Sequence, residues 1–444
     1  MRNRDSVLKR KSVKLTSFLA LWRAAWFVGM PFILLYLWNR GRKDSDYSKA
    51  IGQRFGFHAP TGTQHIWVHA VSLGELRSAV PIIREFLGRG EHIVTTHFTP
   101  AGRREAEKIF AREIADGRLK ATWVPFDYGA PFKRFFKAFQ PKFGLVMEVE
   151  FWPGMIFAAR KARVPLFLCN GQYPGPSFER DKTRVISPAD FVNGFSGVLV
   201  KSEEQADRFR ALGVPKIAVT GEMRFDQPVP EQQTTAAGKV IDQMPARDII
   251  GLCIMTADEE GLVLATVSDL IAEARSKGQT PPLFVVVPRA PERFGPLAGA
   301  IGDLKVSVIK RSDAFSPDLT LNPGFDLNET DVLFGDSLGE MYFYQSLCDR
   351  IVIGGGFTPA GSHNIIEPIS LGKPVYVGPT IWTIEFPARE AIAAGVCVSV
   401  DANDLAQVIR KPHPANDQSI EDFFAAYGGS VAKSLAALKE WGAY

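Results

Sequence analysis

Short apolar runs alternate with amphipathic stretches along the chain from residue 64 onward. In the first half, the runs lie at residues 65–69, 92–96, 122–125, 143–147, 166–170 and 197–200. Stretches with helical periodicity, such as 75–88 and 101–112, lie between them. Strands that alternate with helices are typical of a parallel sheet whose strands are connected by helices. The pattern therefore predicts an open α/β domain over residues 55–226.

The same alternation restarts after a polar segment at residues 227–247, which carries three prolines and is predicted to be a linker. The later runs predict a second α/β domain over residues 248–418, followed by a C-terminal helix over residues 419–444. These runs lie at 249–255, 284–287, 306–309, 332–334, 350–353, 375–377 and 396–400. Open α/β sheets bind ligands beyond the carboxyl ends of their strands. We therefore expect two Rossmann-like domains facing a central cleft, with the functional residues in loops that follow strands.

Residues 1–54 contain an apolar stretch, residues 15–38, in which Arg23 is the only charged side chain. At a helical rise of about 1.5 Å per residue, this stretch is long enough to cross a hydrocarbon core of about 30 Å. A cleaved signal peptide is disfavoured, because the basic segment at 39–43 offers no small-residue cleavage site. A buried helix of a soluble domain is the other alternative. We predict one membrane anchor, which either spans the bilayer or lies in its interface.

Charge is distributed unevenly along the chain. The whole sequence has 52 Lys and Arg and 48 Asp and Glu, but residues 1–54 alone hold 12 basic and 3 acidic residues. A basic segment beside an apolar helix favours an anionic membrane surface over nucleic acid as its partner. The four cysteines have no metal-binding spacing, and we interpret them as reduced thiols inside a cytosolic domain.

The first candidate site follows the first predicted strand and reads His69-Ala70-Val71-Ser72-Leu73-Gly74-Glu75. A carboxylate at the start of a helix beside a cleft can act as a general base toward an attacking hydroxyl group. Ser72 and Glu75 also have the spacing of a capping box, which is a purely structural role. The spacing alone leaves both interpretations open.

The second candidate site is Glu148-Val149-Glu150-Phe151-Trp152-Pro153, which follows the run at 143–147. Alternate residues of an extended chain face the same side, so both glutamates can point toward the cleft. The alternative is that they are ordinary acidic residues at a helix start before Pro153.

Two further segments in the second half have the composition of a nucleotide site. Residues 354–368 read GGGFTPAGSHNIIEP, a glycine-rich loop between a strand and a helix. Backbone N–H groups at such a helix start can hold a phosphate, and Glu367 can accept hydrogen bonds from a ribose. Arg289 or Arg293, after the run at 284–287, can also meet a phosphate. The alternatives are a tight turn for the loop and a surface ion pair with Glu292 for the arginines.

Taken together, these segments resemble the lipid A Kdo transferases, in which Kdo is 3-deoxy-D-manno-octulosonic acid. The resemblance covers nearly the whole chain and includes the basic, apolar N-terminus. The matching motifs are His69-Ala70-x-Ser72-x-Gly74-Glu75, Thr99-Pro100-x-Gly102, Glu148-x-Glu150-x-Trp152-Pro153, Gly221-x-x-x-Phe225-Asp226, Pro288-Arg289-x-Pro291-Glu292-Arg293, Gly335-Asp336-x-x-Gly339-Glu340, Gly361-x-His363-Asn364-x-x-Glu367-Pro368 and Gly372-Lys373-Pro374.

The resemblance implies a GT-B fold and an inverting transfer, without a metal ion or cofactor, from CMP-Kdo to a lipid A-type acceptor. Glu75 matches the family's catalytic base. The acceptor is expected on the N-terminal domain, at Ser72, Gly74, Glu148 and Glu150. The donor is expected on the C-terminal domain, at Arg289, Arg293, Gly361, Ser362, His363, Asn364 and Glu367. The resemblance also places the protein at the inner membrane, with its catalytic domains on the cytoplasmic face.

The chain departs from the family at several positions in the predicted cleft loops. The family's Gly-Ser-Thr-His motif is Ile254-Met255-Thr256-Ala257 here, and a second histidine is replaced by Ala290. An arginine of the family is replaced by Gln172 and a histidine by Thr380. Asparagines of the family are replaced by Gly154 and Thr383. Three other functions therefore stay open: a related membrane glycosyltransferase with another acidic sugar or acceptor, a non-catalytic protein of the same fold, and a nucleotide-sugar epimerase, which should be soluble.

Overall fold

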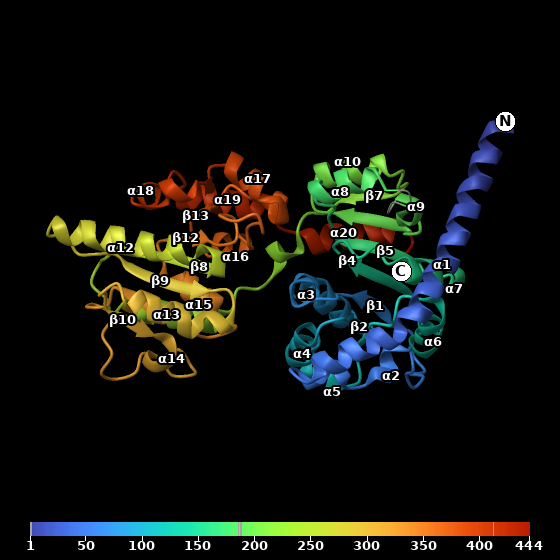
Figure 1. Cartoon of the computed structure of the whole chain (residues 1–444), viewed down its shortest axis with the longest axis horizontal. Helices are drawn as coiled ribbons and strands as arrows, with labels where there is room; N and C mark the ends of the chain where they lie inside the picture. Colours follow the sequence, from blue (N-terminus) through green and yellow to red (C-terminus); the bar gives the residue numbers. More distant parts are fainter. Residues whose placement is uncertain (1, 185, 187–188, 412) are drawn as a thin grey trace. The chain divides into compact units, whose positions relative to one another are not determined.

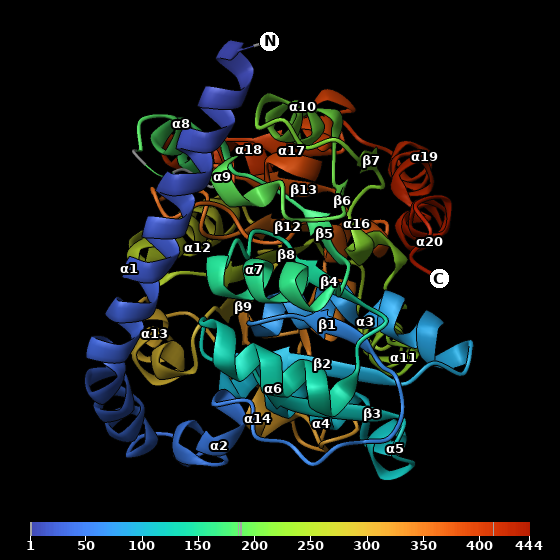
Figure 2. The same ribbon diagram turned by 90° about the vertical axis from the view of Figure 1, so that its right-hand side faces the viewer.

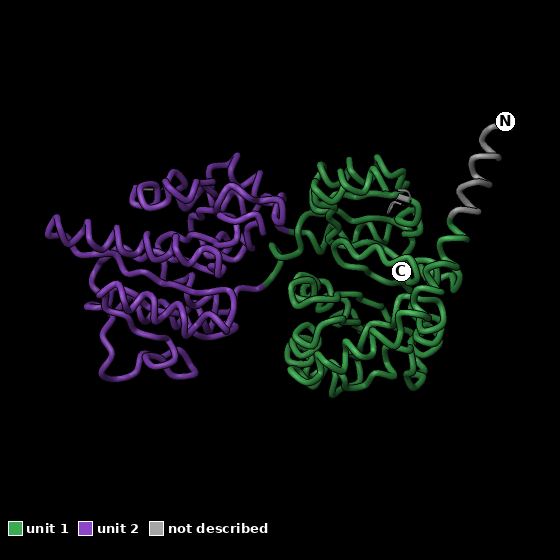
Figure 3. The backbone as a smooth tube through the Cα atoms, viewed as in Figure 1, with its two compact units in different colours: residues 1–227, 429–444 green, residues 228–428 purple. Residues whose placement is uncertain are grey.

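The computed structural model describes residues 2–184, 186, 189–411 and 413–444, with side chains from residue 15 onward. The chain forms two compact units, one of residues 1–227 and 429–444 and one of residues 228–428 (Figure 3). The basic side chains expected at positions 2–14 lie outside the described residues.

The first unit contains a parallel sheet which, over the described residues, has seven strands in the order β3-β2-β1-β4-β5-β6-β7 (Figure 1). Its strands are β1 (Ile66–His69), β2 (Ile93–His97), β3 (Leu119–Trp123), β4 (Phe143–Met147), β5 (Leu166–Gly171), β6 (Gly197–Val200) and β7 (Ile217–Val219). Its helices are α1 (Arg2–Gly41), α2 (Ile51–Arg54), α3 (Leu73–Gly88), α4 (Pro100–Ile109), α5 (Ala111–Ala115), α6 (Gly129–Phe139), α7 (Pro153–Ala162), α8 (Gly175–Lys182), α9 (Ala189–Val192), α10 (Glu203–Ala211) and α20 (Ser430–Glu440).

The second unit repeats this architecture, with a parallel sheet of seven strands over the described residues, in the order β10-β11-β9-β8-β12-β13-β14. Its strands are β8 (Ile249–Met255), β9 (Leu283–Pro288), β10 (Val308–Lys310), β11 (Val332–Phe334), β12 (Arg350–Ile353), β13 (Val375–Val377) and β14 (Cys397–Ser399). Its helices are α11 (Glu231–Ile241), α12 (Glu260–Ser276), α13 (Phe294–Gly302), α14 (Arg311–Ala314), α15 (Met341–Leu347), α16 (Ile366–Ser370), α17 (Glu385–Ala393), α18 (Leu405–Ile409) and α19 (Asp417–Tyr427).

The central strands are buried and largely apolar because helices cover both faces of a parallel sheet. The four residues of β1, for example, are all buried. Side chains on its two faces enter different cores: Val68 packs with Leu76 beneath α3, whereas Trp67 packs with Phe132 and Phe135 of α6. The sequence pattern missed only β7, a three-residue edge strand (Ile217–Val219) whose side chains are partly exposed.

Two boundaries differ from the predicted ones. The segment predicted to be a linker contains α11, which packs against α15 and belongs to the second unit; Gln233 donates a hydrogen bond to the carbonyl of Gly339. The predicted C-terminal helix is two helices, which belong to different units and are separated by Gly428 and Gly429. Gly429 has φ +75°, a backbone conformation that ends helices and suits glycine.

The last helix returns to the first unit for identifiable reasons. Asp226 accepts hydrogen bonds from the backbone N–H groups of Gly429 (2.7 Å) and Val431 (2.6 Å), so it caps α20. Trp441 then stacks on Phe167 of β5, with ring centroids 6.0 Å apart. A Cβ at Gly197 would lie 2.3 Å from the Trp441 ring, so only glycine leaves room for this contact.

Candidate active site

Glu75 lies on the first turn of α3, directly beyond the carboxyl end of β1. Ser72 caps the helix: its Oγ accepts a hydrogen bond from the Glu75 N–H (3.3 Å) and donates one to Glu75 Oε1 (2.8 Å). Glu75 Oε2 accepts from the backbone N–H of Val71 (2.9 Å). The capping contacts predicted as the structural alternative are therefore largely present, and they hold the carboxyl group in one orientation.

Neighbouring backbone fixes this turn. Gly102 of α4 lies against it, and a Cβ there would be 3.1 Å from the carbonyl carbon of Ser72. Thr99 caps α4 by accepting a hydrogen bond from the Gly102 N–H (3.3 Å). The Thr99-Pro100-x-Gly102 motif thus keeps α4 close enough to support the Ser72 loop.

The electrostatics of Glu75 are unusual for a helix cap. Glu75 is 8% exposed. Burial, together with the negative charges of Glu150 and Glu148, raises the pKa of its carboxyl group from 4.5 to about 8. Hydrogen bonds from Val71 and Ser72 favour the charged form but do not outweigh burial. A carboxyl group with a pKa near the working pH is suited to proton transfer.

Glu148 and Glu150 follow β4, and Val149 between them is exposed. Burial also raises the pKa of Glu150, whose carboxylate accepts a hydrogen bond from the Trp152 indole. Glu148 has φ +58°, an unfavourable backbone conformation for a side chain of this kind. Strain of this type is concentrated at functional sites.

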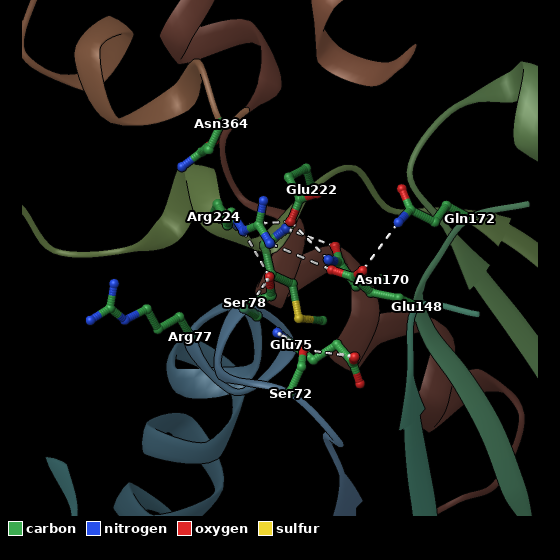
Figure 4. A network of polar contacts seen from close by, with 12 residues as sticks. Ser72, Glu75, Arg77, Ser78, Glu148, Asn170, Gln172, Glu222, Arg224 and Asn364 are labelled. Carbon is green, nitrogen blue, oxygen red and sulfur yellow. Dashed lines mark hydrogen bonds and ion pairs between the residues drawn. The ribbon is translucent and has the colours of Figure 1, made fainter. Parts of the chain in front are cut away.

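Glu148 belongs to a charged network that the sequence did not reveal (Figure 4). Its Oε2 accepts a hydrogen bond from Gln172 Nε2 (3.1 Å), and its Oε1 lies 3.7 Å from Lys201 Nζ and 3.6 Å from Arg224 Nη2. Lys201 in turn donates to Gln172 Oε1 (3.1 Å). Gln172, which stands where the family usually has arginine, therefore bridges Glu148 and Lys201.

Lys201 and Glu222 form the buried centre of this network. They are 4% and 2% exposed, and Lys201 Nζ lies 2.6 Å from Glu222 Oε2. Burial opposes the ionisation of Glu222, but Lys201 and Arg224 outweigh it and hold the pKa of Glu222 below its ordinary value. A charged residue directly after the run at 197–200 was the available signal for Lys201. Glu222 follows β7, the strand that the pattern missed.

Gly154 replaces an asparagine of the family, and the structure shows why glycine is required here. A Cβ at Gly154 would lie 2.3 Å from the carbonyl oxygen of Asp127 and 2.6 Å from its Oδ1. Asp127 caps α7 through the N–H groups of Gly154 (3.2 Å) and Met155 (2.7 Å). An asparagine would have to displace this cap.

We expect Gly154→Ala to lower the free energy of unfolding by about 1–3 kcal/mol, the usual cost of overpacking a close contact. Gly129→Ala is the matched control, because Gly129 also begins a helix and a Cβ there meets nothing within 4 Å. Urea denaturation of both variants measures the difference. Equal stabilities of the two variants would contradict the close approach.

In the second unit, the glycine-rich loop after β12 is closed by internal contacts. Glu259 is 2% exposed and accepts hydrogen bonds from the N–H groups of Gly355 (2.7 Å) and Phe357 (3.2 Å). The N–H of Ser362 donates to the Thr380 carbonyl (2.9 Å), and that of His363 to the Gly354 carbonyl (3.1 Å). A buried carboxylate and two carbonyl groups therefore already bind these four N–H groups, and they are not available to a phosphate.

The helix of this segment also starts later than predicted. It begins at Ile366 rather than near Ser362, and Asn364 Oδ1 accepts the hydrogen bond of the Ile366 N–H (3.0 Å). Glu367 lies on its first turn. Gly361 has φ +94°, and a Cβ there would lie 2.7 Å from Thr383, so this glycine serves the loop conformation.

Two side chains of this loop keep polar atoms that no described residue satisfies. Ser362 Oγ and His363 Nε2 are buried without a hydrogen-bond partner among the described residues. Burial lowers the pKa of His363 to about 4, and the charge of Arg289 adds to this effect, so the imidazole is neutral at pH 7. Buried polar atoms without partners are candidates for contacts with a ligand.

The two predicted arginines differ from each other. Arg293 forms an ion pair with Glu260, donating from Nε to Oε1 at 2.6 Å. The alternative of an ion pair was therefore correct, but its partner is Glu260 rather than Glu292. Arg289 is exposed after β9 and has no ion pair with a carboxylate in the described parts of the chain. Of the two, Arg289 is available to a ligand.

The remaining departures have modest structural consequences. Ala257 is exposed, and Ala290 is half-buried, so neither alanine fills a core. Thr383 donates a hydrogen bond to the Ser362 carbonyl (2.5 Å), and the Thr380 carbonyl accepts from Ser362. Ile254, where the family has glycine, has φ +61°, a strained conformation for a β-branched residue.

The chain is similar to known proteins over nearly its whole length. Residues 49–227 match a family model described as 3-deoxy-D-manno-octulosonic-acid transferase (kdotransferase). A 3-deoxy-D-manno-octulosonic acid transferase of Bordetella pertussis is 32% identical over 424 residues, which cover 93% of this chain and 96% of that protein.

Solved structures share the fold at low sequence identity. A glycosyltransferase of Rickettsia africae superposes with a TM-score of 0.52 at 14% identity, over 85% of this chain and 99% of that one. A UDP-GlcNAc 2-epimerase of Methanocaldococcus jannaschii gives a TM-score of 0.53 at 13% identity, over 85% of this chain and 100% of that one. At these identities the likeness concerns the fold alone.

Proposed function

Because the chain belongs to the Kdo transferase family, we propose that it transfers Kdo from CMP-Kdo to lipid A or its tetra-acylated precursor, with Glu75 as general base. The protein is a glycosyltransferase of lipopolysaccharide biosynthesis with a GT-B fold of two parallel α/β sheets. The observation that carries the choice of base is the buried carboxyl group of Glu75, beyond the end of β1, with its pKa raised to about 8.

In the proposed reaction, the Glu75 carboxylate takes the proton of an acceptor hydroxyl group. The acceptor oxygen then forms a bond to the anomeric carbon of Kdo. The bond from that carbon to the phosphate oxygen breaks at the same time, and CMP leaves with the bonding electrons. Ser72 and Val71 hold the carboxylate in place, while Glu148 and Glu150 strengthen it as a base by raising its proton affinity.

We assign the donor to the second unit and the acceptor to the first. Arg289 is a cation without an ion pair among the described residues, and it suits the phosphate or carboxylate of the donor. Ser362 Oγ and His363 Nε2 are the buried polar atoms that a donor can satisfy. We also propose that α1 anchors the protein at the inner membrane, with both units on the cytoplasmic side. One helix among the described residues, at 15–41, is long and apolar enough for this role.

A transfer assay tests the proposal directly. The protein, purified in detergent, is incubated with CMP-Kdo generated in situ and a tetra-acylated lipid A precursor, and the product is read by mass spectrometry. We expect a mass increase of one or more Kdo units. No product, with an active family member in the same assay, would overturn the proposed reaction.

A related donor is the second candidate, and specific residues favour it. Gln172 takes the place of an arginine in the Glu148 network, and Ala257 and Ala290 replace histidines. Lost charges and hydrogen-bond donors at a ligand weaken binding by about 1.5–3 kcal/mol each. Turnover of another nucleotide-activated acidic sugar, without turnover of CMP-Kdo, would establish this alternative.

The pH dependence of kcat/KM is expected to follow the ionisation of Glu75. A general base acts in its deprotonated form, so kcat/KM should rise with pH and level off above an apparent pKa of about 8. Below that value, activity should fall about tenfold per pH unit. Initial rates between pH 6 and 10 at low acceptor concentration give this profile. A profile that is flat between pH 6 and 9 would contradict the raised pKa as the controlling ionisation.

A further inference from the structure

The part of α1 around Trp22 and Trp26 contacts the first unit, beside which the helix runs (Figure 2). Trp22 Nε1 donates a hydrogen bond to the Asp127 carbonyl (2.8 Å), and the Trp26 ring lies 5.5 Å from the ring of Phe126. On the other side, large apolar side chains are bare: Leu21 is 74% exposed and Phe32 is 71% exposed. A helix with one docked side and one bare apolar side is suited to lie beside the domain with its outer face in lipid.

Between α1 and the helices α6 and α7 lies a cavity of about 1160 Å³. Its walls are mainly apolar and include Leu19, Trp26, Met30, Phe157 and Ala158. This volume exceeds the range of about 300–1,000 Å³ that is usual for small-molecule sites. We call this cavity the α1 groove. Its composition fits hydrocarbon better than a nucleotide or a sugar.

The floor of the α1 groove is built from small residues of α7. Gly154, Ala158 and Ala162 line the cavity at intervals of four residues, so they lie on one face of the helix. Asp127 forces glycine at the first of these positions, as described above. Larger side chains on this face would fill the space between the two helices.

The charges at the α1 groove have a single sign. Arg23, Lys133 and Lys161 line it, and no acidic side chain does. All three are exposed, and none has an ion pair with a carboxylate in the described parts of the chain. An apolar cavity with only cations at its edge complements a molecule that has hydrocarbon chains and phosphate groups.

The α1 groove continues toward Glu75. A second cavity of about 340 Å³ shares Trp22 and Trp26 with it and is also lined by Phe98 and Trp152. Trp152 donates a hydrogen bond to Glu150, and its ring lies 5.1 Å from that of His69, at the end of β1. Glu150 is the charged residue that contributes most to the raised pKa of Glu75. The second cavity therefore has one wall in common with the α1 groove and another, Trp152, that contacts the surroundings of the proposed base.

We propose that the α1 groove binds acyl chains of the acceptor lipid, with Arg23, Lys133 and Lys161 contacting its phosphate groups, so that a sugar hydroxyl group is presented to Glu75. This inference rests on the proposed function and adds to it the site that selects acylated acceptors. The bare outer face of α1 places the groove at the membrane surface, where such an acceptor lies.

The test compares two acceptors, a tetra-acylated disaccharide bisphosphate and its fully deacylated counterpart. Ala158→Trp, which fills the groove from α7, should lower the ratio of kcat/KM for the acylated to the deacylated acceptor by about 10- to 100-fold. Met30→Trp tests the same space from α1. Ala111→Trp, at an exposed position of α5, is the control and should leave the ratio unchanged. An unchanged ratio in both groove variants, in folded protein, would overturn the inference.

A binding measurement separates this inference from the proposed reaction. A tetra-acylated disaccharide bisphosphate with a photoreactive diazirine on one acyl chain is bound to the full-length protein, irradiated and mapped by mass spectrometry. Cross-links to residues 19–34 or 154–162, lost in Ala158→Trp, support the groove even if no sugar is transferred. Transfer by the wild-type protein with cross-links only elsewhere would reject the groove and leave the proposed reaction standing.

Discussion

Glu75→Gln is expected to lower kcat for transfer by about 10²–10⁴-fold and, at the same time, to raise the melting temperature above pH 8. The loss of activity follows because an amide cannot accept the proton of the acceptor hydroxyl. The gain in stability follows from the raised pKa of Glu75, about 8 in the folded protein against 4.5 ordinarily. Between these values the fold retains a proton that the unfolded chain releases, so the wild type loses stability as pH rises from 4.5 to 8.

Glutamine is never ionised, so its advantage in stability should be full above pH 8 and disappear below about pH 4.5. Differential scanning calorimetry at several pH values, combined with the transfer assay, measures both effects. Ser72→Ala is the control, because it removes the helix cap and should cost about 1 kcal/mol without removing the carboxylate. Full activity of Glu75→Gln would refute the role of the base. A melting temperature of Glu75→Gln below that of the wild type above pH 8 would contradict the raised pKa of the buried Glu75 carboxyl group.

Lys201→Met is expected to destabilise the first unit by about 3–5 kcal/mol, the usual cost of leaving a buried charge without its partner. Glu222 is 2% exposed, and Lys201 Nζ is 2.6 Å from its Oε2. Asn170, which donates to Glu222 Oε1 at 2.8 Å, cannot supply the missing charge. Urea denaturation at pH 7, followed by tryptophan fluorescence, measures the loss.

Two comparisons make this prediction specific. Lys216→Met changes an exposed lysine at the edge of the same sheet and should cost little. Glu222→Gln combined with Lys201→Met removes both charges and should recover much of the loss. The pKa of Glu222 is held below its ordinary value of 4.5, so its pairing stabilises the fold at neutral pH. The difference from wild type should therefore shrink as the pH falls from 4.5 through this lowered pKa and the carboxylate protonates. An equal loss in Lys216→Met would contradict the proposed role of the pair.

The sequence by itself determined the architecture of both units. Runs such as those at 143–147 and 350–353 are strands with the predicted bounds, because strands that are covered on both faces are mostly apolar. The same rule placed Glu75, Glu148 and Arg289 in loops that follow strands. The motifs, taken in order, also identified the family. All of this information is local or periodic, so it can be read from one chain.

Only the tertiary structure decided what these residues do electrostatically. Whether Glu75 is a cap or a candidate base depends on burial and on two glutamates more than 70 residues away in the sequence, and it proved to have the geometry of both. The same holds for Glu259, which binds N–H groups of the glycine-rich loop from a position about 100 residues earlier in the chain. Segments that are distant in sequence also meet in the ion pair of Lys201 with Glu222, in the close contact of Gly154 with Asp127, and in the α1 groove. Their energies come from desolvation and close contact, which a linear pattern does not contain.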